Sequence, residues 1–334
     1  MNTTISIIVP AYNAEKTIEK TLMTICHQTY TDLEIIVIDD GSKDKTFDIV
    51  KSLAEQDHRI IAVRQNNAGP GAARNTGIST ASGSYIMFAD SDDEMRINAV
   101  ERMYETASKM ADTELVVCGF TINKEQGNTF ELKPDAGSWE KDSYYVGIEM
   151  LQGKKCFNSL CNKLFLSRII KENSIAIDTK LTMGEDYLFV VDYIHFMNGK
   201  LVAISDPLYQ YNLSDGGLQS AYSSSEYMGR IQRAEALKTV YRDNNYPLSG
   251  IYNGLVGSFY TVLITAENPK MVLKDLYKTE QYKEICNNID LIKGTKFKVF
   301  ATLLKSRMTV IILALLTVFQ RYKELNGTAM FERK

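Results

Sequence analysis

The first 120 residues alternate short apolar runs with amphipathic stretches. The apolar runs that predict strands lie at 5–9, 33–38, 60–63, 85–89 and 115–118. Helical spacing of apolar residues occurs between and after them, at 15–27, 44–55, 72–81 and 97–107. Because strands without polar alternation are buried on both faces, this order predicts an α/β fold with a mostly parallel central sheet and flanking helices. Such sheets bind ligands at the carboxyl ends of their strands.

The pattern changes after residue 120. Weak periodicity over 123–159 predicts an irregular connection, and helical spacing returns around 186–196 before a short strand near 201–204. From Tyr227 onward the pattern is mostly helical. We therefore expect an α/β part followed by a mostly helical C-terminal region.

Charged residues are unevenly distributed along the chain. The formal net charge is −3, yet residues 293–334 contain nine Lys or Arg against two acidic residues, a local charge of +7. A basic segment on an acidic body predicts an anionic partner, and we expect the headgroups of a membrane surface. We expect no nucleic-acid partner.

Two features indicate the compartment in which the chain works. The five cysteines form no CxxC pair, which favours reduced thiols. The starting sequence MNTTISIIVPAYN has neither a basic n-region nor a long apolar stretch, so we expect no secretory signal. The chemistry should then face the cytoplasm.

Three carboxylates in four residues follow the predicted strand at 85–89. They are Asp90, Asp92 and Asp93, with Ser91 between the first two. A hard divalent cation would offset their mutual repulsion, since Mg²⁺ or Mn²⁺ takes one or two carboxylates together with phosphate oxygens. A solvated turn that caps the next helix explains the same residues equally well, because aspartate is also a favoured N-cap.

Two further polar loops follow predicted strands. Asp40, within Asp39-Asp40-Gly41-Ser42, can accept hydrogen bonds from a ribose or a base N–H, although these four residues also make an ordinary turn. In residues 66–75, NNAGPGAARN, small residues let the backbone approach a ligand, and Arg74 offers a planar fork for phosphate or a base carbonyl. No Gly-Lys-Ser/Thr closes this second loop, so it is not a P-loop.

Four motifs occur in a fixed order: SIIVPAYNAE, IDDGS, NAGPGAARNTG and GSYIMFADSDD. Together they resemble the signature of the inverting glycosyltransferase family 2, closely over residues 4–120 and more loosely to about residue 215. The resemblance implies a GT-A catalytic domain over 1–220, with a nucleotide-sugar half at 1–120 and an acceptor half at 121–220. The helical region 221–334 would follow it.

The resemblance also implies a role for each matched residue. Asp40 would bind the base, Arg74 would belong to the nucleotide pocket, and Asp90 would contact the ribose or the sugar. Asp92 would ligate the Mn²⁺ or Mg²⁺ that bridges the diphosphate of a UDP-sugar. The other expected donor contacts are Pro10, Tyr12 and Glu15 at the base, Asn67 and Ser91 within the motifs, and Ser220 in a loop that begins at Tyr209 and closes over the diphosphate.

Inversion requires a base on the acceptor side, because the attacking hydroxyl must lose its proton. The segment 183–189, MGEDYLF, resembles the Glu-Asp segment of the family, whose aspartate is that base. We therefore expect Asp186 to be the base, with Glu185 in support. An acidic helix start favoured by the helix dipole is the alternative.

The segment 294–323 combines basic residues with an apolar run at 309–319. As a helix the run covers about 16 Å, short of the roughly 30 Å of a bilayer core. We therefore expect a basic amphipathic helix at the membrane interface, although a buried helix of a C-terminal bundle explains the run nearly as well.

The expected function is inverting, metal-dependent transfer of a single sugar from a UDP-sugar to an acceptor hydroxyl. The acceptor would be a saccharide on a lipid-linked oligosaccharide or a cell-surface polysaccharide precursor, at the inner face of the cell membrane. A nucleotidyltransferase normally has a glycine-rich first loop, and this chain has Pro10-Ala11-Tyr12-Asn13 there. A non-catalytic nucleotide-sugar-binding protein would need neither metal carboxylates nor a base.

Overall fold

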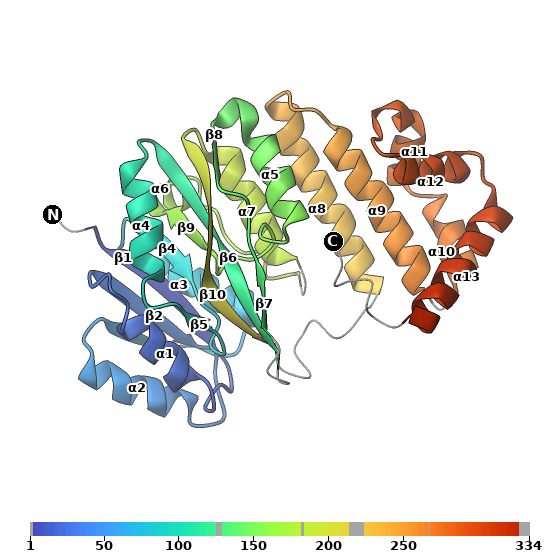
Figure 1. Ribbon diagram of the computed structural model, residues 1–334. Helices are drawn as coiled ribbons and strands as arrows, with labels where there is room; N and C mark the ends of the chain where they lie inside the picture. Colours follow the sequence, from blue (N-terminus) through green and yellow to red (C-terminus); the bar gives the residue numbers. More distant parts are fainter. Residues whose placement is uncertain (1–2, 125–128, 182–183, 214–223, 267, 327–334) are drawn as a thin grey trace. The chain divides into compact units, whose positions relative to one another are not determined.

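The computed structural model describes residues 3–124, 129–181, 184–213, 224–266 and 268–326. The chain divides into two compact units, Met1–Tyr222 and Ser223–Lys334. The first unit holds a large sheet with helices on both of its faces, as Figure 1 shows, and the second consists of helices. The predicted α/β fold followed by a mostly helical region is therefore confirmed.

Four parallel strands form one side of the sheet, in the order β3-β2-β1-β4. They are β1 (Ile5–Ala11), β2 (Leu33–Asp39), β3 (Ile60–Arg64) and β4 (Tyr85–Phe88). Every residue of β1 is buried, because helices cover both faces of this part of the sheet. The apolar runs predict all four strands correctly, and the polar loops that follow them lie at the carboxyl edge of the sheet.

The helices between these strands also follow the predicted order. They are α1 (Ile18–Cys26), α2 (Thr46–Gln56), α3 (Pro70–Thr80) and, after the two-residue strand β5 (Glu94–Met95), α4 (Ala99–Lys109). The helix predicted at 15–27 begins only at Ile18. Its first three expected residues form a turn, in which the amide of Glu15 donates to Asp44 in the loop after β2.

The other side of the sheet contains a strand that the apolar pattern does not predict. β9 (Lys163–Leu166) lies between β4 and β6 (Thr113–Lys124) and is antiparallel to both. Its four residues begin with a lysine, so the apolar run is too short to indicate a strand. β6 and β10 (Lys200–Leu213) are parallel to each other and much longer than the runs predicted at 115–118 and 201–204.

The expectation of an irregular connection over 123–159 is wrong. This stretch contains β7 (Thr129–Leu132), β8 (Gly137–Trp139), the 3₁₀ helix η1 (Lys141–Ser143) and α5 (Tyr144–Gly153). Gly147 weakens the helix signal in the middle of α5, but a Cβ at that position would lie 2.7 Å from the Trp139 ring. Close packing against Trp139 therefore requires glycine at this position, and the same glycine weakens the sequence signal for the helix.

The predicted helix at 186–196 is present as α7 (Glu185–Phe196), which follows α6 (Ser167–Glu172). Phe189 of α7 packs edge-to-face on Phe88 of β4 and Phe165 of β9, with ring centroids 5.8 and 5.6 Å apart. This aromatic cluster holds the first turn of α7 beside the end of β4.

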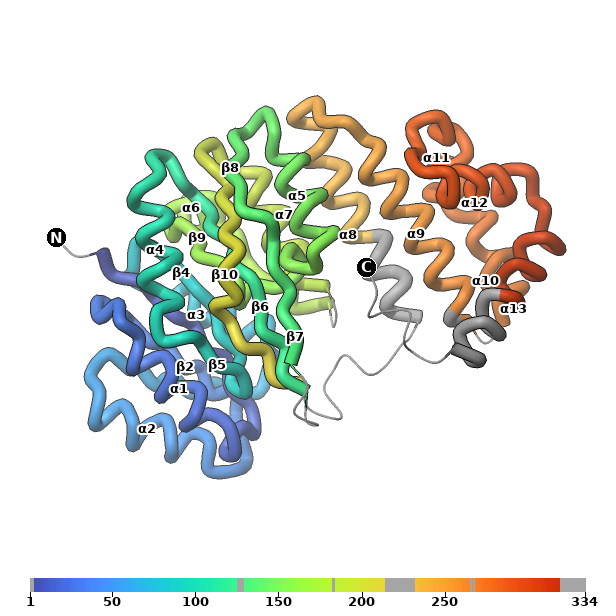
Figure 2. Tube along the Cα trace, viewed as in Figure 1, coloured from blue at the N-terminus to red at the C-terminus, as the bar shows by residue number. Residues whose placement is uncertain are grey.

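The second unit is built from helices, as the sequence predicts. They are α8 (Ser224–Asp243), α9 (Ser249–Thr265), α10 (Pro269–Leu276), α11 (Glu280–Asn287), η3 (Ile289–Leu291), α12 (Thr295–Lys305) and α13 (Thr309–Asn326). α8 and α9 lie side by side (Figure 2), and Leu255, Phe259 and Leu263 of α9 are fully buried. Within the described ranges, none of the helices combines the length and the apolarity that crossing a bilayer requires.

Candidate active site

Helix α3 places a buried arginine beside the end of β4. Gly77 lets α3 approach β1 closely, since a Cβ at that position would lie 2.3 Å from Cγ2 of Ile8. Arg74 lies one turn earlier, with 8% of its side-chain surface exposed. Its Nη2 donates to Oδ1 of Asp90 at 2.8 Å, and its Nη1 lies 3.4 Å from Oδ1 of Asp186. One guanidinium thus joins the loop after β4 to the first turn of α7.

The surroundings of Asp186 change its acidity. Its side chain keeps 24% of its surface exposed, yet enough protein surrounds the carboxyl to desolvate it. This burial raises the pKa of Asp186 to about 6; the cation of Arg74 lowers that pKa, while the charges of Glu185 and Asp90 raise it. A carboxylate with a pKa near neutrality can accept a proton and still be ionised when the reaction starts.

Glu185 lies next to Asp186 and shares its cation. Oε1 of Glu185 is 4.0 Å from Nη1 of Arg74, a longer distance than that to Asp186. Both acidic residues lie in the first turn of α7, where the helix dipole also favours negative charge. The structure thus brings together three residues that the sequence places in separate motifs, Arg74, Asp90 and Asp186.

The loop after β4 crowds three carboxyl groups together. Burial raises the pKa of Asp92, and the charge of Asp90 raises it further. Burial also raises the pKa of Asp93 to about 8, and Oδ2 of Asp93 is buried without a hydrogen-bond partner. A cation bound at this loop would relieve the mutual repulsion of the carboxylates.

The part of the chain that the structure describes holds no group of three or more His, Cys, Asp or Glu side chains placed to bind a metal ion. Mg²⁺ and Mn²⁺ need only one or two carboxylates when phosphate oxygens complete the coordination. Both oxygens of Asp90 already accept hydrogen bonds, from Arg74 and from Cys161, so the exposed Asp92 is the carboxylate that fits a cation bound together with a diphosphate.

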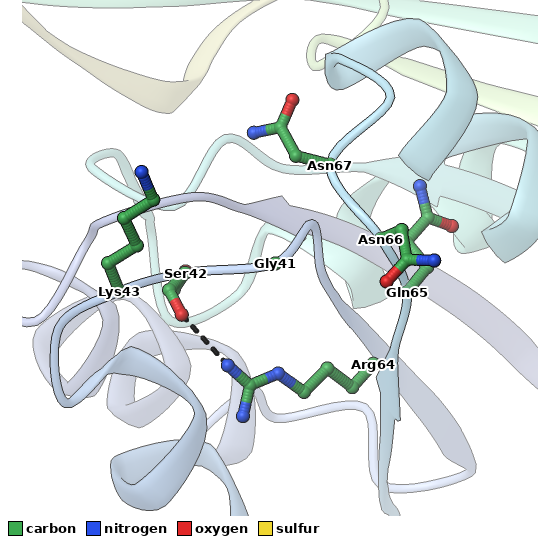
Figure 3. A pocket seen from close by; sticks show the side chains of 7 residues that line it. All are labelled: Gly41, Ser42, Lys43, Arg64, Gln65, Asn66 and Asn67. Carbon is green, nitrogen blue, oxygen red and sulfur yellow. Dashed lines mark hydrogen bonds between the residues drawn. The ribbon is translucent and has the colours of Figure 1, made fainter.

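The loops after β2 and β3 form a recess of about 750 Å³, which Figure 3 shows. It is lined by Gly41, Ser42, Lys43, Arg64, Gln65, Asn66 and Asn67. Arg64 reaches back from the end of β3 and donates to the carbonyl oxygen of Ser42 at 2.8 Å. Gly41 has a φ of +74°, and a Cβ there would lie 2.9 Å from the amide nitrogen of Asn67, so glycine lets the two loops pack. Asn67 thus lines a recess formed by both loops.

Asp40 shapes the loop that follows β3. Its Oδ1 accepts from the side chain of Gln65 at 2.7 Å and from the amide of Ala68 at 2.9 Å. Its Oδ2 accepts from the amide of Gly69 at 2.8 Å. Oδ2 thus accepts one of the two hydrogen bonds that a carboxylate oxygen can take, and Asp40 as a whole is only 3% exposed.

The loop after β1 contributes residues of two kinds. Pro10 is buried in β1 opposite Ile38, and Oε2 of Glu15 accepts from the amide of Lys45 at 3.1 Å. These two residues support the loop. Tyr12 has an exposed ring, which leaves its face open to a planar group.

The remaining expected contacts have different outcomes. The carbonyl oxygen of Ser91 accepts from the hydroxyl of Thr21 at 3.0 Å, which anchors the loop after β4 to α1. Ser220 lies outside the described residues. The expectation that Tyr209 begins a loop over the diphosphate is wrong, because residues 209–212 belong to β10. The buried hydroxyl of Tyr209 accepts the amide of Asp90 at 2.9 Å instead.

Two further contacts at Asp90 and Asp93 are not predicted from the sequence. Sγ of Cys161 donates to Oδ2 of Asp90 at 3.4 Å, and the amide of Asn212 donates to Oδ1 of Asp93 at 2.8 Å. Cys161 precedes the unpredicted strand β9, so only the sheet topology brings it to Asp90. The polar residues Asn162 and Lys163 at the start of an apolar run are the one local signal in the sequence.

Comparison with known proteins defines the class. The structure of S. aureus TarS residues 1–349, solved in complex with UDP-GlcNAc, matches with a TM-score of 0.69 and 20% identity, covering 96% of this chain and 92% of that one. At that identity the likeness shows the fold, which is the GT-A fold of glycosyltransferases.

The family follows from the sequence comparison. The model named Glycosyl transferase family 2 matches residues 6–173, and the chain belongs to this family. It is 30% identical over 250 residues to Glycosyltransferase GlyA of Streptococcus pneumoniae. The aligned region covers 73% of this chain but only 35% of GlyA. It is 28% identical over 287 residues to a GalNAc(5)-diNAcBac-PP-undecaprenol beta-1,3-glucosyltransferase of Campylobacter jejuni, covering 84% of this chain and 89% of that protein.

Proposed function

We propose that the chain transfers a single sugar from a UDP-sugar to a hydroxyl of a saccharide acceptor, with inversion at the anomeric carbon. The observation that carries this proposal is the position of Arg74 between Asp90 and Asp186. One guanidinium contacts both carboxylates, of which Asp90 would act on the donor and Asp186 would accept the proton of the acceptor. The UDP-GlcNAc complex of TarS, which shares the fold, supports a UDP-sugar as the donor.

The uracil and ribose would bind at the recess between the loops after β2 and β3. Asp40 would accept a base N–H at Oδ2, Asn67 lines the recess, and the exposed ring of Tyr12 can stack on a base. Pro10 and Glu15 would act by supporting the loop that carries Tyr12.

The diphosphate would bind near the loop after β4. Asp92 would hold Mn²⁺ or Mg²⁺ there, with Asp90 and the backbone of Ser91 beside it. When bound, the cation would supply charge neutralisation for the departing diphosphate. Ser220 stays a prediction as a further diphosphate contact.

Asp186 would take the proton of the acceptor hydroxyl as that oxygen attacks the anomeric carbon from the face opposite the diphosphate. Glu185 would add negative charge that keeps the pKa of Asp186 raised. Arg74 would oppose this effect and would hold Asp90 in place through a charged hydrogen bond.

The acceptor would be a saccharide on a lipid-linked oligosaccharide or a cell-surface polysaccharide precursor. The name of the Campylobacter jejuni relative includes an undecaprenol-linked oligosaccharide, which supports an acceptor of this class. We assign the catalytic part to residues 1–220, because every proposed contact with donor or acceptor lies within it, and the helical part to residues 221–334.

Peripheral association with an anionic membrane surface at the cytoplasmic face is a second part of the proposal. Helix α13 buries Ile312 and Leu316 but exposes apolar side chains along its other side, from 41% for Ile311 to 81% for Val310. The exposed residues are Val310, Ile311, Leu315 and Val318, hereafter the α13 stripe.

The charge around the α13 stripe supports lipid over a second protein surface. Residues 293–323 contain no Asp or Glu. Five exposed basic residues precede α13, namely Lys293, Lys296, Lys298, Lys305 and Arg307. An apolar helix face flanked by cations fits acyl chains beneath anionic headgroups.

A donor screen tests the transfer proposal. The purified protein would be incubated with Mn²⁺ and a panel of nucleotide sugars, and the released nucleotide would be measured. We expect UDP from at least one UDP-sugar and little release from GDP- or CDP-sugars. Release of pyrophosphate from a nucleoside triphosphate and a sugar phosphate would instead indicate a nucleotidyltransferase.

A further inference from the structure

Lys163 is a fully buried lysine at the start of β9. Its ammonium donates to the carbonyl oxygens of Cys156, at 3.1 Å, and Ser159, and to Oδ1 of Asn162 at 2.8 Å. All three N–H groups are therefore satisfied by neutral acceptors. Burial lowers the pKa of Lys163 to about 8, so the group still carries a charge at neutral pH in most molecules.

These hydrogen bonds close the turn formed by residues 156–162. Nδ2 of Asn162 adds bonds to the carbonyl oxygens of Cys156 at 3.0 Å and of Cys118 in β6 at 2.7 Å. The turn is thus fixed both to Lys163 and to the neighbouring strand. An apolar side chain in place of Lys163 would leave the buried carbonyl oxygens of Cys156 and Ser159 without this donor.

The turn places Cys161 beside Asp90. Sγ of Cys161 donates to Oδ2 of Asp90 at 3.4 Å, while Oδ1 of the same carboxylate accepts from Arg74 at 2.8 Å. The backbone amide of Asp90 is bound to Tyr209 as well. Asp90 is therefore held at three points, and the Cys161 contact depends on the turn that Lys163 closes.

Lys163 is also the second cation whose charge acts on Asp186. Burial raises the pKa of Asp186 most, and four charges also act on it: those of Arg74 from α3, Lys163 from β9, Glu185 from its own helix and Asp90 from the loop after β4. The start of β9 lies against α7, since Phe165 packs on Phe189 with ring centroids 5.6 Å apart. The two cations lower the pKa of the carboxyl, and the two acidic groups raise it. Among the described residues no carboxylate lies at ion-pair distance from Lys163. Its charge therefore acts on Asp186 without being neutralised by a nearer carboxylate.

We propose that Lys163 is a positioning residue for the transfer reaction. It closes the turn that places Cys161 on Asp90, and its buried charge favours the ionised form of Asp186. The inference rests on the proposed function, which gives these two carboxylates their roles. It adds a residue that touches neither donor nor acceptor and acts through both carboxylates.

The charge is tested by an NMR titration of the Asp186 carboxyl in protein carrying ¹³C-labelled aspartate, with Asp186→Asn used for assignment. Lys163→Gln keeps amide donors near the same acceptors and removes the charge, and Lys163→Met removes both. We expect the Asp186 midpoint to move to higher pH by roughly half a unit or more in each folded variant. An unchanged midpoint in folded Lys163→Gln would overturn the electrostatic part. This readout uses no donor or acceptor, so it does not depend on the proposed reaction.

The positioning is tested with a matched pair of cysteine variants. Cys161→Ala removes the thiol on Asp90, and Cys118→Ala removes an equally buried thiol of β6 that does not contact Asp90. We expect Cys161→Ala to raise the KM for the UDP-sugar about 3–10-fold, in keeping with the loss of one weak hydrogen bond, and Cys161→Ser to restore it. Equal KM values for Cys161→Ala and Cys118→Ala would overturn this part. Absence of turnover in the wild-type protein with every UDP-sugar would count against the proposed function, and the NMR titration would still decide the inference.

Discussion

Nη1 of Arg74 lies 3.4 Å from Oδ1 of Asp186, and this contact shifts the pKa of Asp186 in the direction opposite to burial. Burial raises the pKa of the carboxyl and the guanidinium lowers it, and the pKa is left at about 6. Because a base must be deprotonated to act, the rate of transfer should rise with pH through about 6 and level off above it. Arg74 therefore moves the lower pH limit of the reaction to a more acidic pH than burial alone would give.

Replacing Arg74 should move that limit. In Arg74→Gln the carboxyl loses a cation that lowers its pKa, so the acid limb of the kcat/KM profile should shift to higher pH. The free energy of unfolding should fall by about 3 kcal/mol, the lower end for breaking a buried charge pair, because Asp90 and Asp186 keep some exposure. Chemical denaturation and a pH–rate profile would measure the two effects.

Arg59→Gln is the control for that substitution. Arg59 also pairs with an aspartate, Asp57, with Nη2 and Oδ2 2.7 Å apart, but it contacts none of the site carboxylates. It should lower stability without moving the acid limb. A shift of equal size in both variants would mean that the limb reports general loss of stability and not the charge beside Asp186.

Donor binding should require a divalent cation. Asp92 and Asp90 would repel a diphosphate in the absence of a metal ion, and burial together with the charge of Asp90 already raises the pKa of Asp92. Calorimetry should give UDP affinity at least about tenfold weaker in EDTA than in Mn²⁺. Uridine, which has no diphosphate, is the control, and its affinity should not change. Equal UDP affinity in both conditions would contradict the metal assignment.

The α13 stripe should mediate binding to anionic lipid. Ala301, Leu304, Ile312 and Leu316 of α12 and α13 are buried, so deleting these helices would uncover the parts of α9 and α10 that they pack on, and point substitutions are the better test. The triple variant Val310→Ser, Leu315→Ser and Val318→Ser should lose most co-sedimentation with phosphatidylglycerol vesicles and keep donor hydrolysis. Raised salt should weaken the wild-type interaction, since the surrounding charge is screened within about a Debye length.

Exposed apolar residues elsewhere provide the control for the vesicle assay. Ile97→Ser and Leu291→Ser remove comparable exposed surface outside α13 and should leave sedimentation unchanged. If the α13 variant still binds vesicles, or if it instead changes the oligomeric state, the stripe covers something other than lipid.

The apolar pattern predicts the parallel half of the fold correctly because each of its strands is short, continuous and buried on both faces. It fails for β9 and α5, where pairing and packing outweigh local preference. β9 begins with Lys163, whose charge is satisfied only by a turn formed in the folded protein. α5 contains Gly147, which serves contact with Trp139.

The candidate site shows the same division. Asp90, Asp186 and Arg74 lie within local sequence motifs, so their chemistry can be inferred from residue type and order. The contacts of Asp90 with Cys161 and Tyr209 depend on strands that come together only in the sheet, 71 and 119 positions away in the chain. Residues that position a site from such distances leave no spacing in the sequence to detect.

The most direct test of the central claim compares Asp186→Asn with the wild-type protein in a transfer assay and in UDP binding. Asparagine keeps the shape of the side chain but cannot take the proton of the acceptor. We expect UDP affinity close to that of the wild-type protein and transfer lowered on the order of 10²–10⁴-fold, while Glu185→Gln retains most of its activity. Transfer at the wild-type rate in Asp186→Asn would contradict the account and would place the base elsewhere.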